Sequence, residues 1–504
     1  MRGGISRRFF LGGAVSAVAG AVFADAPARS IRPRPRDPEK IAAVVRELRR
    51  QSAPAVSDLI DEARLGGTVG FLVADARTGD VLESRLPDDP QPPASVAKSV
   101  TALYALTRLG EDFRFRTRLI ATGPVTEGRL DGDLVLEGSG DPVLDTDDLA
   151  EIVAQLKATG VREITGRFRI YSGALPYIHS IDPEQPDHVG YNPSISGVNL
   201  NFNRVHFQWT RADSGWAVSL DARSDTLRPA VSVAKMAVVN RDLPVYTYRD
   251  AKGVDEWTVA SQALGNGGSR WLPVRRPDLY AGEVLQVLAG AQGIRLPNAE
   301  ITTTRPAGTA IVTHDSASLS AVTRLMLRYS TNITAEVLGL TASRKGGAPV
   351  DDLRASARAM SDWMRVSMGA KDASFLDHSG LSGESRVSAR DMVSMMVKVG
   401  PGQALHTHLK DIPVWDDDSR PVTGAHYTIQ AKTGTLNFVS ALAGYITPEV
   451  GPPLAFAIFT ADVPRREALA PEEMERPDGA SAWAGRARLL QQKLIRRWAA
   501  VYSV

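Results

Sequence analysis

The stretch PPASVAKSVTALYAL, from Pro92 to Leu106, predicts the start of a helix that carries a lysine among apolar residues. Two prolines suit the approach to a helix and its first turn, so we expect Ser95 near the N-terminus and Lys98 one turn later on the same face. Burial and the positive end of the helix dipole both lower the pKa of such a lysine. A neutral amine beside a serine hydroxyl can serve as the base of a nucleophilic serine. A lysine that extends to solvent explains the same pattern, and a Ser-x-x-Lys arises by chance about once in a chain of this length.

The composition is that of an ordinary globular protein. Of 504 residues, 43% are hydrophobic and 23% are charged, and 59 Lys and Arg nearly balance 57 Asp and Glu. The net charge of +2 gives no reason to expect nucleic acid as a partner. The chain has no cysteine, which excludes disulfides and thiol catalysis. The length suggests about three domains, or one large domain with an insertion.

The N-terminal segment has the pattern of a twin-arginine export signal. Arg7 and Arg8 stand in a Ser-Arg-Arg-x-Phe-Leu arrangement that precedes a short apolar run rich in Gly and Ala. We expect residues 1–24 to form a signal peptide, cleaved after Ala24, and residues 25–37 to form a linker rich in Pro and Arg. The alternative is an uncleaved anchor. Periplasmic location by the twin-arginine route follows, with membrane contact of the mature protein at most peripheral.

The order of predicted elements indicates an α+β fold with a large insertion. A helix over 38–51 and strands over 68–75 and 80–84 precede the Ser95 helix. Residues 119–306 change to short β-type runs and contain one expected helix, at DTDDLAEIVAQLKATG. Helices and then strands return, so an antiparallel sheet flanked by helices should be built from both chain ends. We therefore expect a catalytic domain of residues 38–118 and 307–504, and an inserted β-rich region of 119–306 with two subdomains.

Two further motifs match the needs of a serine acylated with the help of a lysine. Ser330 and Asn332, separated by Thr331, can project to the same side of a short connection between helices. Lys432-Thr433-Gly434-Thr435 ends a strand, where Gly434 leaves space for a ligand against the strand edge. Each motif alone is typical of a cap, a turn or a hairpin end. Ser-x-x-Lys, Ser-x-Asn and Lys-Thr-Gly in this order form the set typical of β-lactamases and penicillin-binding proteins.

The chain resembles the low-molecular-mass class C penicillin-binding proteins, which are D-alanyl-D-alanine carboxypeptidases and endopeptidases of peptidoglycan. The resemblance runs from about Pro38 to the C-terminus and includes the segments GDLVLEGSGDPVL, VNLNFNRVHF, DHSGLSGESRVSARDM and RPDGASAWAGRARLLQ. The large separation of Ser95 from Ser330 is similar to this family's insertion between its first two motifs. Thr331 stands where relatives often have Asp, and His378 where they often have a small residue, so we assign neither a role.

The resemblance implies a role for each motif residue. Ser95 would be the acylated nucleophile and Lys98 its base, while Ser330 and Asn332 would shuttle protons and hold the substrate backbone. The remaining residues would bind substrate: Lys432 and Thr433 would anchor the terminal carboxylate, Gly434 would leave room for it, and the N–H groups of Ser95 and Thr435 would form the oxyanion hole. Lys432 is also expected to lower the pKa of Lys98 further. Peptidoglycan stem peptides and cross-links would be substrates and β-lactams covalent inhibitors, with no cofactor and no metal.

Other functions remain as alternatives. A β-lactamase would need an efficient deacylating base, and the sequence has no Glu-x-x-Leu-Asn-like segment for it. A non-catalytic peptidoglycan-binding scaffold is disfavoured by the presence of Ser95, Lys98 and Lys432. The eight histidines form no His-Glu-x-x-His motif, and we expect the pair His406 and His408 at the surface. The apolar stripe of the last helix either packs on the sheet, the favoured interpretation, or lies on a membrane.

Overall fold

The structure is a computed structural model. It describes residues 38–502, except for residues 349, 419, 471–472 and 476. The predicted signal peptide, residues 1–24, and the predicted linker, residues 25–37, lie outside these described residues.

An antiparallel sheet of six strands joins the two ends of the described chain. The strand order is β17, β18, β19, β20, β1, β2. β1 pairs with β20 along its whole length, from Thr68 opposite Ala461 to Asp75 opposite Leu454. This confirms the prediction of one sheet built from both chain ends. The strands are β1 Thr68–Asp75, β2 Val81–Arg85, β17 Lys410–Asp411, β18 Tyr427–Leu436, β19 Val439–Pro448 and β20 Leu454–Ala461.

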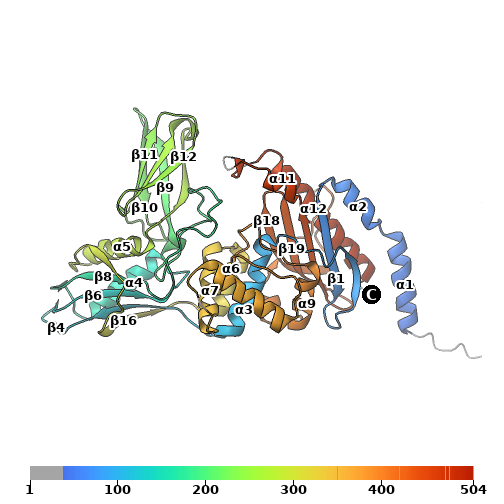
Figure 1. Cartoon of the computed structure of the whole chain (residues 1–504), viewed down its shortest axis with the longest axis horizontal. Helices are drawn as coiled ribbons and strands as arrows, with labels where there is room; N and C mark the ends of the chain where they lie inside the picture. The colour runs from blue at the N-terminus through green and yellow to red at the C-terminus, as the bar shows by residue number, and fades with distance from the viewer. Residues whose placement is uncertain (1–37, 349, 419, 471–472, 476, 503–504) are drawn as a thin grey trace, which may run out of the picture.

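Helices cover both faces of this sheet (Figure 1). β20 is buried along its whole length because side chains on both of its faces meet helices. On one face, α9 Ala389–Val399 and α10 Ala404–His408 contact the strands. The same buried core extends to α3 Ala97–Leu109, α6 Leu319–Tyr329, α7 Asn332–Lys345 and α8 Leu353–Trp363. The other face packs against α2 Val56–Ala63 and α12 Ala480–Tyr502, while α1 Pro38–Ser52 packs on α12 and α11 Val463–Glu467 follows β20.

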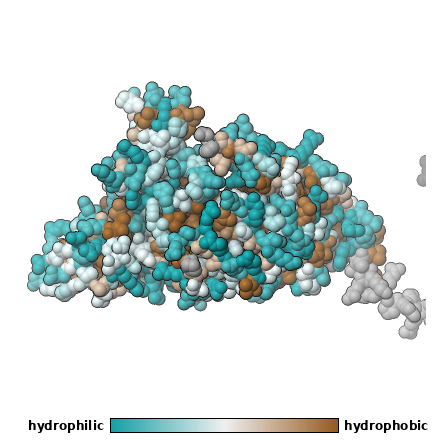
Figure 2. All heavy atoms as spheres, viewed as in Figure 1, coloured by the Kyte–Doolittle hydropathy of each residue, from teal (hydrophilic) through white to brown (hydrophobic). Residues whose placement is uncertain are grey.

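The C-terminal helix α12 packs on the sheet, as its apolar stripe favours. The stripe is buried at Ala487, Leu490, Leu494, Trp498 and Val501. Arg497 also lies on the buried side of the helix, where it pairs with Glu83 of β2 at 3.1 Å. Within the described part of the chain, no helix is both long and apolar enough to span a bilayer. The face shown in Figure 2 is mostly hydrophilic, with apolar residues in small separate groups.

The inserted region is built on a second, five-stranded sheet. Its order is β15, β8, β6, β3, β16. β3 carries the chain into this region and β16 carries it out, and the two strands pair with Arg116 opposite Asp315. The two ends of the insertion therefore lie side by side. The strands are β3 Arg116–Ala121, β6 Leu134–Gly138, β8 Phe168–Tyr171, β15 Ala299–Thr302 and β16 Thr309–Asp315, with a small sheet of β4 Val125–Thr126, β5 Arg129–Leu130 and β7 Glu163–Ile164.

Two three-stranded sheets form an arm that stands on this part of the inserted region (Figure 1). Their strand orders are β10, β9, β14 and β11, β13, β12. Trp257 and Phe207 from the arm share one buried core with Leu136 of the five-stranded sheet. The strands are β9 Arg204–Arg211, β10 Trp216–Asp221, β11 Ala234–Val239, β12 Tyr246–Asp250, β13 Asp255–Ala260 and β14 Gly267–Pro273.

The inserted region contains one more helix than the sequence analysis expects. α4 Thr146–Ala158 is the predicted helix, and α5 Pro277–Ala291 is the additional one. α5 was missed because its apolar residues are not confined to one stripe and two glycines interrupt it, both of which weaken a helical pattern. Gly282 has a packing reason, since a Cβ there would lie 2.6 Å from the Cβ of Ala299 on β15.

Candidate active site

Ser95 lies in a tight turn immediately before α3. Residues Ala94–Val96 form one 3-10 turn and α3 begins at Ala97. Ala94 is fully buried and has a positive φ of 45°, a conformation that non-glycine residues rarely adopt. Strained backbone of this kind persists where the surrounding packing holds it. The turn leaves Ser95 partly exposed on the wall of a cavity, while its neighbours Ala94 and Val96 are buried.

Lys98 is fully buried one turn after Ser95 and contacts three acceptors. Its Nζ donates to Ser95 Oγ at 2.9 Å, to Asn332 Oδ1 at 2.7 Å and to the Ser379 carbonyl at 2.8 Å. Burial lowers the pKa of Lys98 to about 8, although Asp377 and Glu336 act in the opposite direction. Burial is the main cause of the lowered pKa of Lys98. An amine with this pKa can accept a proton from Ser95 near neutral pH.

The second motif lies at the junction of α6 and α7. Ser330 ends α6 in the left-handed conformation, with φ 59°, and Asn332 begins α7. Asn332 connects two parts of the site, because its Oδ1 accepts from Lys98 and its Nδ2 donates to the Tyr191 carbonyl at 2.9 Å. Ser330 Oγ accepts from Lys432 Nζ at 3.0 Å. The structure thus brings Ser95, Lys98, Ser330 and Asn332 together.

The third motif occupies the last residues of β18. Lys432 is 2% exposed, and burial together with the charge of Lys98 lowers the pKa of Lys432 well below its ordinary value. Gly434 has a different role from the expected one: a Cβ there would lie 2.6 Å from the Pro93 carbonyl oxygen and 3.1 Å from Ser95 N. Its missing side chain therefore makes room for the turn of Ser95. Thr435 lines the cavity, while Thr433 is exposed and is not part of the cavity wall.

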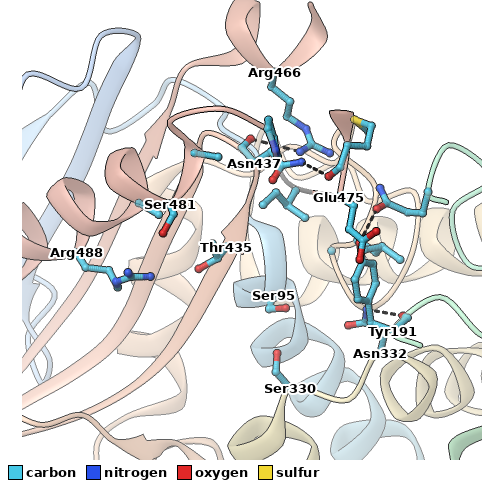
Figure 3. A pocket seen from close by; sticks show the side chains of 18 residues that line it. Ser95, Tyr191, Ser330, Asn332, Thr435, Asn437, Arg466, Glu475, Ser481 and Arg488 are labelled. Atoms are coloured by element: carbon cyan, nitrogen blue, oxygen red, sulfur yellow. Dashed lines mark hydrogen bonds between the residues drawn. The ribbon is translucent and has the colours of Figure 1, made fainter. Parts of the chain in front are cut away.

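The cavity beside Ser95 has a volume of about 750 Å³. Ser95, Ser330 and Thr435 lie together at its base, with Tyr191 and Glu475 on one side and Ser481 and Arg488 on the other (Figure 3). Other lining residues carry no motif in the sequence analysis, and we call them the upper wall of the cavity: Gln185, Tyr191, Asn437, Arg466, Glu475 and Arg488.

The upper wall is held together by polar contacts between the inserted region and the C-terminal part of the chain. Glu475 accepts from Arg270 of β14 at 2.8 Å and contacts His188 Nε2 at 2.8 Å. The hydrogen bond with His188 has the largest effect, and together with Arg270 it lowers the pKa of Glu475 to about 2. Arg466 is largely buried, which lowers the pKa of its guanidinium. Residues 185–191 meet Arg466, Glu475 and Arg488 only through the folding of the insertion, so no local signal in the sequence marks their position around one cavity.

Two histidines outside the cavity wall are buried: His408, which we expected at the surface, and His378, to which we assigned no role. His408 is buried, contrary to prediction, and contacts Ser320 Oγ at 3.0 Å and Thr323 Oγ1 at 3.2 Å. His378 is fully buried and contacts Ser356 Oγ at 2.8 Å. Burial lowers the pKa of His378 to about 3, so this residue is neutral at physiological pH.

One group of described residues could hold a metal ion. The ligand atoms of Asp148, Glu151 and His314 lie within 4.8 Å of one another. The group joins α4 to β16 in the inserted region, and none of its members lines the cavity of Ser95. The chemistry of a serine and a lysine makes no use of it.

Comparison with known proteins agrees with this geometry. Residues 52–480 match the D-Ala-D-Ala carboxypeptidase 3 (S13) family, and the chain belongs to this family. This confirms the resemblance found in the sequence and makes the protein a serine peptidase of the D-Ala-D-Ala carboxypeptidase class.

Curated relatives and solved structures extend the match over most of the chain. A D-alanyl-D-alanine carboxypeptidase of Actinomadura sp. is 27% identical over 437 residues, which are 79% of this chain and 79% of the relative. The D-alanyl-D-alanine carboxypeptidase DacB of Haemophilus influenzae is 23% identical over 80% of this chain and 87% of the relative. The crystal structure of penicillin-binding protein 4 from Haemophilus influenzae aligns with a TM-score of 0.68 at 20% identity, covering 81% of this chain and 93% of that one. The predicted α+β fold is confirmed.

Proposed function

We propose that the protein is a D-Ala-D-Ala carboxypeptidase of peptidoglycan in which Ser95 is the acylated nucleophile and Lys98 is its base. The observation that carries this proposal is the position of the fully buried Lys98. Its Nζ lies 2.9 Å from Ser95 Oγ, and burial lowers its pKa to about 8. A lysine so placed can hold Ser95 ready for attack and then take its proton.

The proposed reaction is an acyl transfer to Ser95 followed by hydrolysis. Ser95 Oγ attacks the carbonyl carbon of the penultimate D-alanine while its proton passes to Lys98 Nζ. The C–N bond then breaks, and the terminal D-alanine leaves as an amine with a proton delivered through Ser330. Water finally attacks the ester and regenerates the serine. Backbone N–H groups of Ser95 and Thr435 would stabilise the oxyanion of each tetrahedral intermediate.

The residues of β18 support substrate binding in different ways. Lys432 contacts Ser330 Oγ directly, so its proton and charge would act on the substrate through Ser330. Thr435 lies on the cavity wall and would meet the terminal carboxylate, and Gly434 admits the turn that carries Ser95. The role of Thr433 as a carboxylate anchor rests on the family resemblance and is tested by Thr433→Ala, which should raise KM for peptides.

Stem peptides and D-Ala-meso-diaminopimelate cross-links are the proposed substrates, and β-lactams the proposed covalent inhibitors. The two relatives described above are D-alanyl-D-alanine carboxypeptidases, which supports stem peptides as substrates. A solved complex of the Haemophilus influenzae protein with a β-lactam supports covalent inhibition. A β-lactam presents an amide carbonyl that the same hydroxyl can attack. The rival activities, β-lactamase or a binding scaffold, predict rapid turnover of the antibiotic or no labelling at all.

We also propose that the protein works in the periplasm after export by the twin-arginine route. The Ser-Arg-Arg-x-Phe-Leu pattern around Arg7 and Arg8 supports this location, as does a substrate that lies outside the cytoplasmic membrane. The double substitution Arg7→Lys with Arg8→Lys should leave the protein in the cytoplasm. Normal periplasmic accumulation of that variant would refute the route.

Incubation of the purified protein with penicillin tests the proposed chemistry. We expect one added drug mass, located on Ser95 by peptide mapping, and loss of both labelling and D-alanine release in Ser95→Ala. Ser481→Ala, on the same cavity wall, is the matched control and should retain both. Labelling that persists in Ser95→Ala would refute the assignment. Digestion of monomeric and cross-linked muropeptides then separates carboxypeptidase from endopeptidase action.

A further inference from the structure

Two fully buried acids lie beside Lys98 and have no part in the chemistry described so far. Glu336 is on α7, one turn after Asn332 and on the same face of the helix. Asp377 begins a short segment, residues 377–382, which we call the 377–382 loop. Glu336 is 0% exposed and Asp377 is 1% exposed. Burying an ionisable acid is energetically unfavourable, so a buried pair of acids needs a reason.

Glu336 reaches Lys98 through the backbone of the 377–382 loop. Its two carboxylate oxygens accept from His378 N at 2.9 Å and from Ser379 N at 2.8 Å. The carbonyl of the same Ser379 accepts from Lys98 Nζ at 2.8 Å. The carboxylate therefore fixes the residue that supplies one of the three contacts of the lysine.

Asp377 holds the other half of this loop. Its oxygens accept from Gly380 N and Ser382 N, both at 2.6 Å. Gly380 has a positive φ of 73°, and any side chain there would collide with the Ala94 carbonyl of the nucleophile turn. The loop thus packs directly against the backbone next to Ser95, and the two acids set its conformation.

The charges of the acids also act on the lysine. Burial raises the pKa of Glu336 to about 8 and that of Asp377 to about 6, while both acids act to raise the pKa of Lys98. The other ionisable groups around this pair are His378 in the loop, Asp182 of the inserted region and Lys432 of β18. Four backbone N–H groups donate to the two acids, and these bonds favour the carboxylate form of each.

We propose that Glu336 and Asp377 are a pair of positioning residues that hold the Ser379 carbonyl against Lys98 and stabilise the ammonium formed when Lys98 takes the proton of Ser95. This inference rests on the proposed roles of Ser95 and Lys98. In the acylation step the proton moves from Ser95 Oγ to Lys98 Nζ, so positive charge appears in a fully buried site at that moment. The carboxylates lower the free energy of that charged state because they are already oriented and need not reorganise. A neutral amide at either position could accept only one of the two N–H bonds and could not supply this charge.

The test is the pH dependence of acylation by a fluorescent penicillin, measured from pH 4.5 to pH 10. Glu336→Gln keeps the size of the side chain and removes its charge. We expect its acylation rate constant to fall about 100-fold at high pH, because the charge that stabilises the ammonium is lost. The midpoint of the pH profile should shift down by about one unit, because Lys98 loses a group that raises its pKa. KM for D-alanine release should change little.

Three further proteins separate this role from a purely structural one. Glu336→Asp restores the charge, so its midpoint should return towards that of the unmodified enzyme even if its rate stays low. Asp377→Asn should shift the midpoint in the same direction as Glu336→Gln. Glu384→Gln is the control, since this acid is exposed two residues after the 377–382 loop and its substitution should change nothing. A midpoint in Glu336→Gln equal to that of the unmodified enzyme would overturn the inference.

The unmodified enzyme provides a measurement that needs no variant to fold. Below pH 6, acylation should require a neutral Lys98 and the carboxylate forms of both Glu336 and Asp377, so the logarithm of the rate should rise by more than one, and by up to about three, per pH unit. A slope of about one across this range would overturn the inference, because the lysine alone would then control the step. If the unmodified protein is not labelled on Ser95 at all, the proposed function fails together with this inference. If it is labelled and only the slope or the midpoint fails, the proposed function stands.

Discussion

The base of the active-site cavity and its upper wall are built on different principles. The base of the cavity consists of two hydrogen-bonded groups, Ser95 with Lys98 and Asn332, and Ser330 with Lys432. Both lysines are buried. The upper wall, with Tyr191, Arg466, Glu475 and Arg488, is assembled from the inserted region and the C-terminal part of the chain. A rigid, desolvated base suits proton transfer, while a charged and open wall suits the choice of a peptide. We therefore expect substitutions at the base of the cavity to change kcat, and substitutions in its upper wall to change KM.

The largest effect should follow from Lys98→Met. This change removes the base but keeps an unbranched side chain in a fully buried position. We expect acylation by penicillin to slow by about 10³-fold to 10⁴-fold, with the rise of the rate towards pH 8 lost as well. Stopped-flow labelling across pH measures both, and thermal unfolding checks the fold. Acylation that keeps its normal pH profile in this variant would assign the base to another group.

Gly434→Ala should have the next largest effect. It tests the geometry at the base of the cavity without removing any reactive group. The new methyl group would lie 2.6 Å from the Pro93 carbonyl and 3.1 Å from Ser95 N, so the nucleophile turn or the end of β18 must move. A displacement of about 1 Å at a reacting atom can cost 10²-fold in rate. We expect kcat for D-alanine release to fall by about this factor. Gly485→Ala on α12, where a Cβ meets nothing within 4 Å, should leave kcat unchanged.

The same contrast explains what the sequence could predict. Residues of the base stand in short motifs whose spacing puts them on one helix turn or one strand end, so the pairing of Ser95 with Lys98 follows from the sequence alone. The α+β fold followed from strands at both chain ends. Helix α5 was missed because its apolar residues follow no single stripe, and His408 was misplaced because burial by Ser320 and Thr323 depends on tertiary contacts. Tyr191 comes from the inserted region. Glu336 lies one turn after Asn332, but it meets Lys98 only through the 377–382 loop, so no local pattern reveals either contact.

Tyr191→Ala should have a moderate effect that falls on KM. The Tyr191 side chain lines the cavity, whereas its backbone carbonyl accepts from Asn332 Nδ2 and is unaffected by the change. Removing an aromatic contact in a binding site costs about 1–3 kcal/mol, so KM for a peptide substrate should rise by about tenfold or more, with kcat nearly constant. Steady-state release of D-alanine gives both numbers. A fall in kcat with unchanged KM would group Tyr191 with the residues at the base of the cavity. It would contradict the division between a base that sets kcat and a wall that sets KM.

The smallest effect should come from Glu475→Gln. This change weakens the polar contacts that hold the upper wall together but leaves a side chain of the same size on the cavity wall. Glu475 accepts from Arg270 and contacts His188, and these partners lower its pKa from 4.5 to about 2. A depressed pKa means that the ionised form is favoured in the folded protein, so its contribution is complete above pH 4.5 and disappears only as the pH falls towards 2. The group is partly exposed, so solvent screening keeps the contribution small.

We expect KM for peptides to rise about twofold to threefold in Glu475→Gln, by the same factor at pH 6 and pH 8, because the acid is ionised at both. Steady-state assays at the two pH values, with Glu467→Gln of α11 as an exposed control, measure this factor. An effect on kcat, or one that appears only at pH 6, would show that the wall and the base are coupled and that the division between them does not hold.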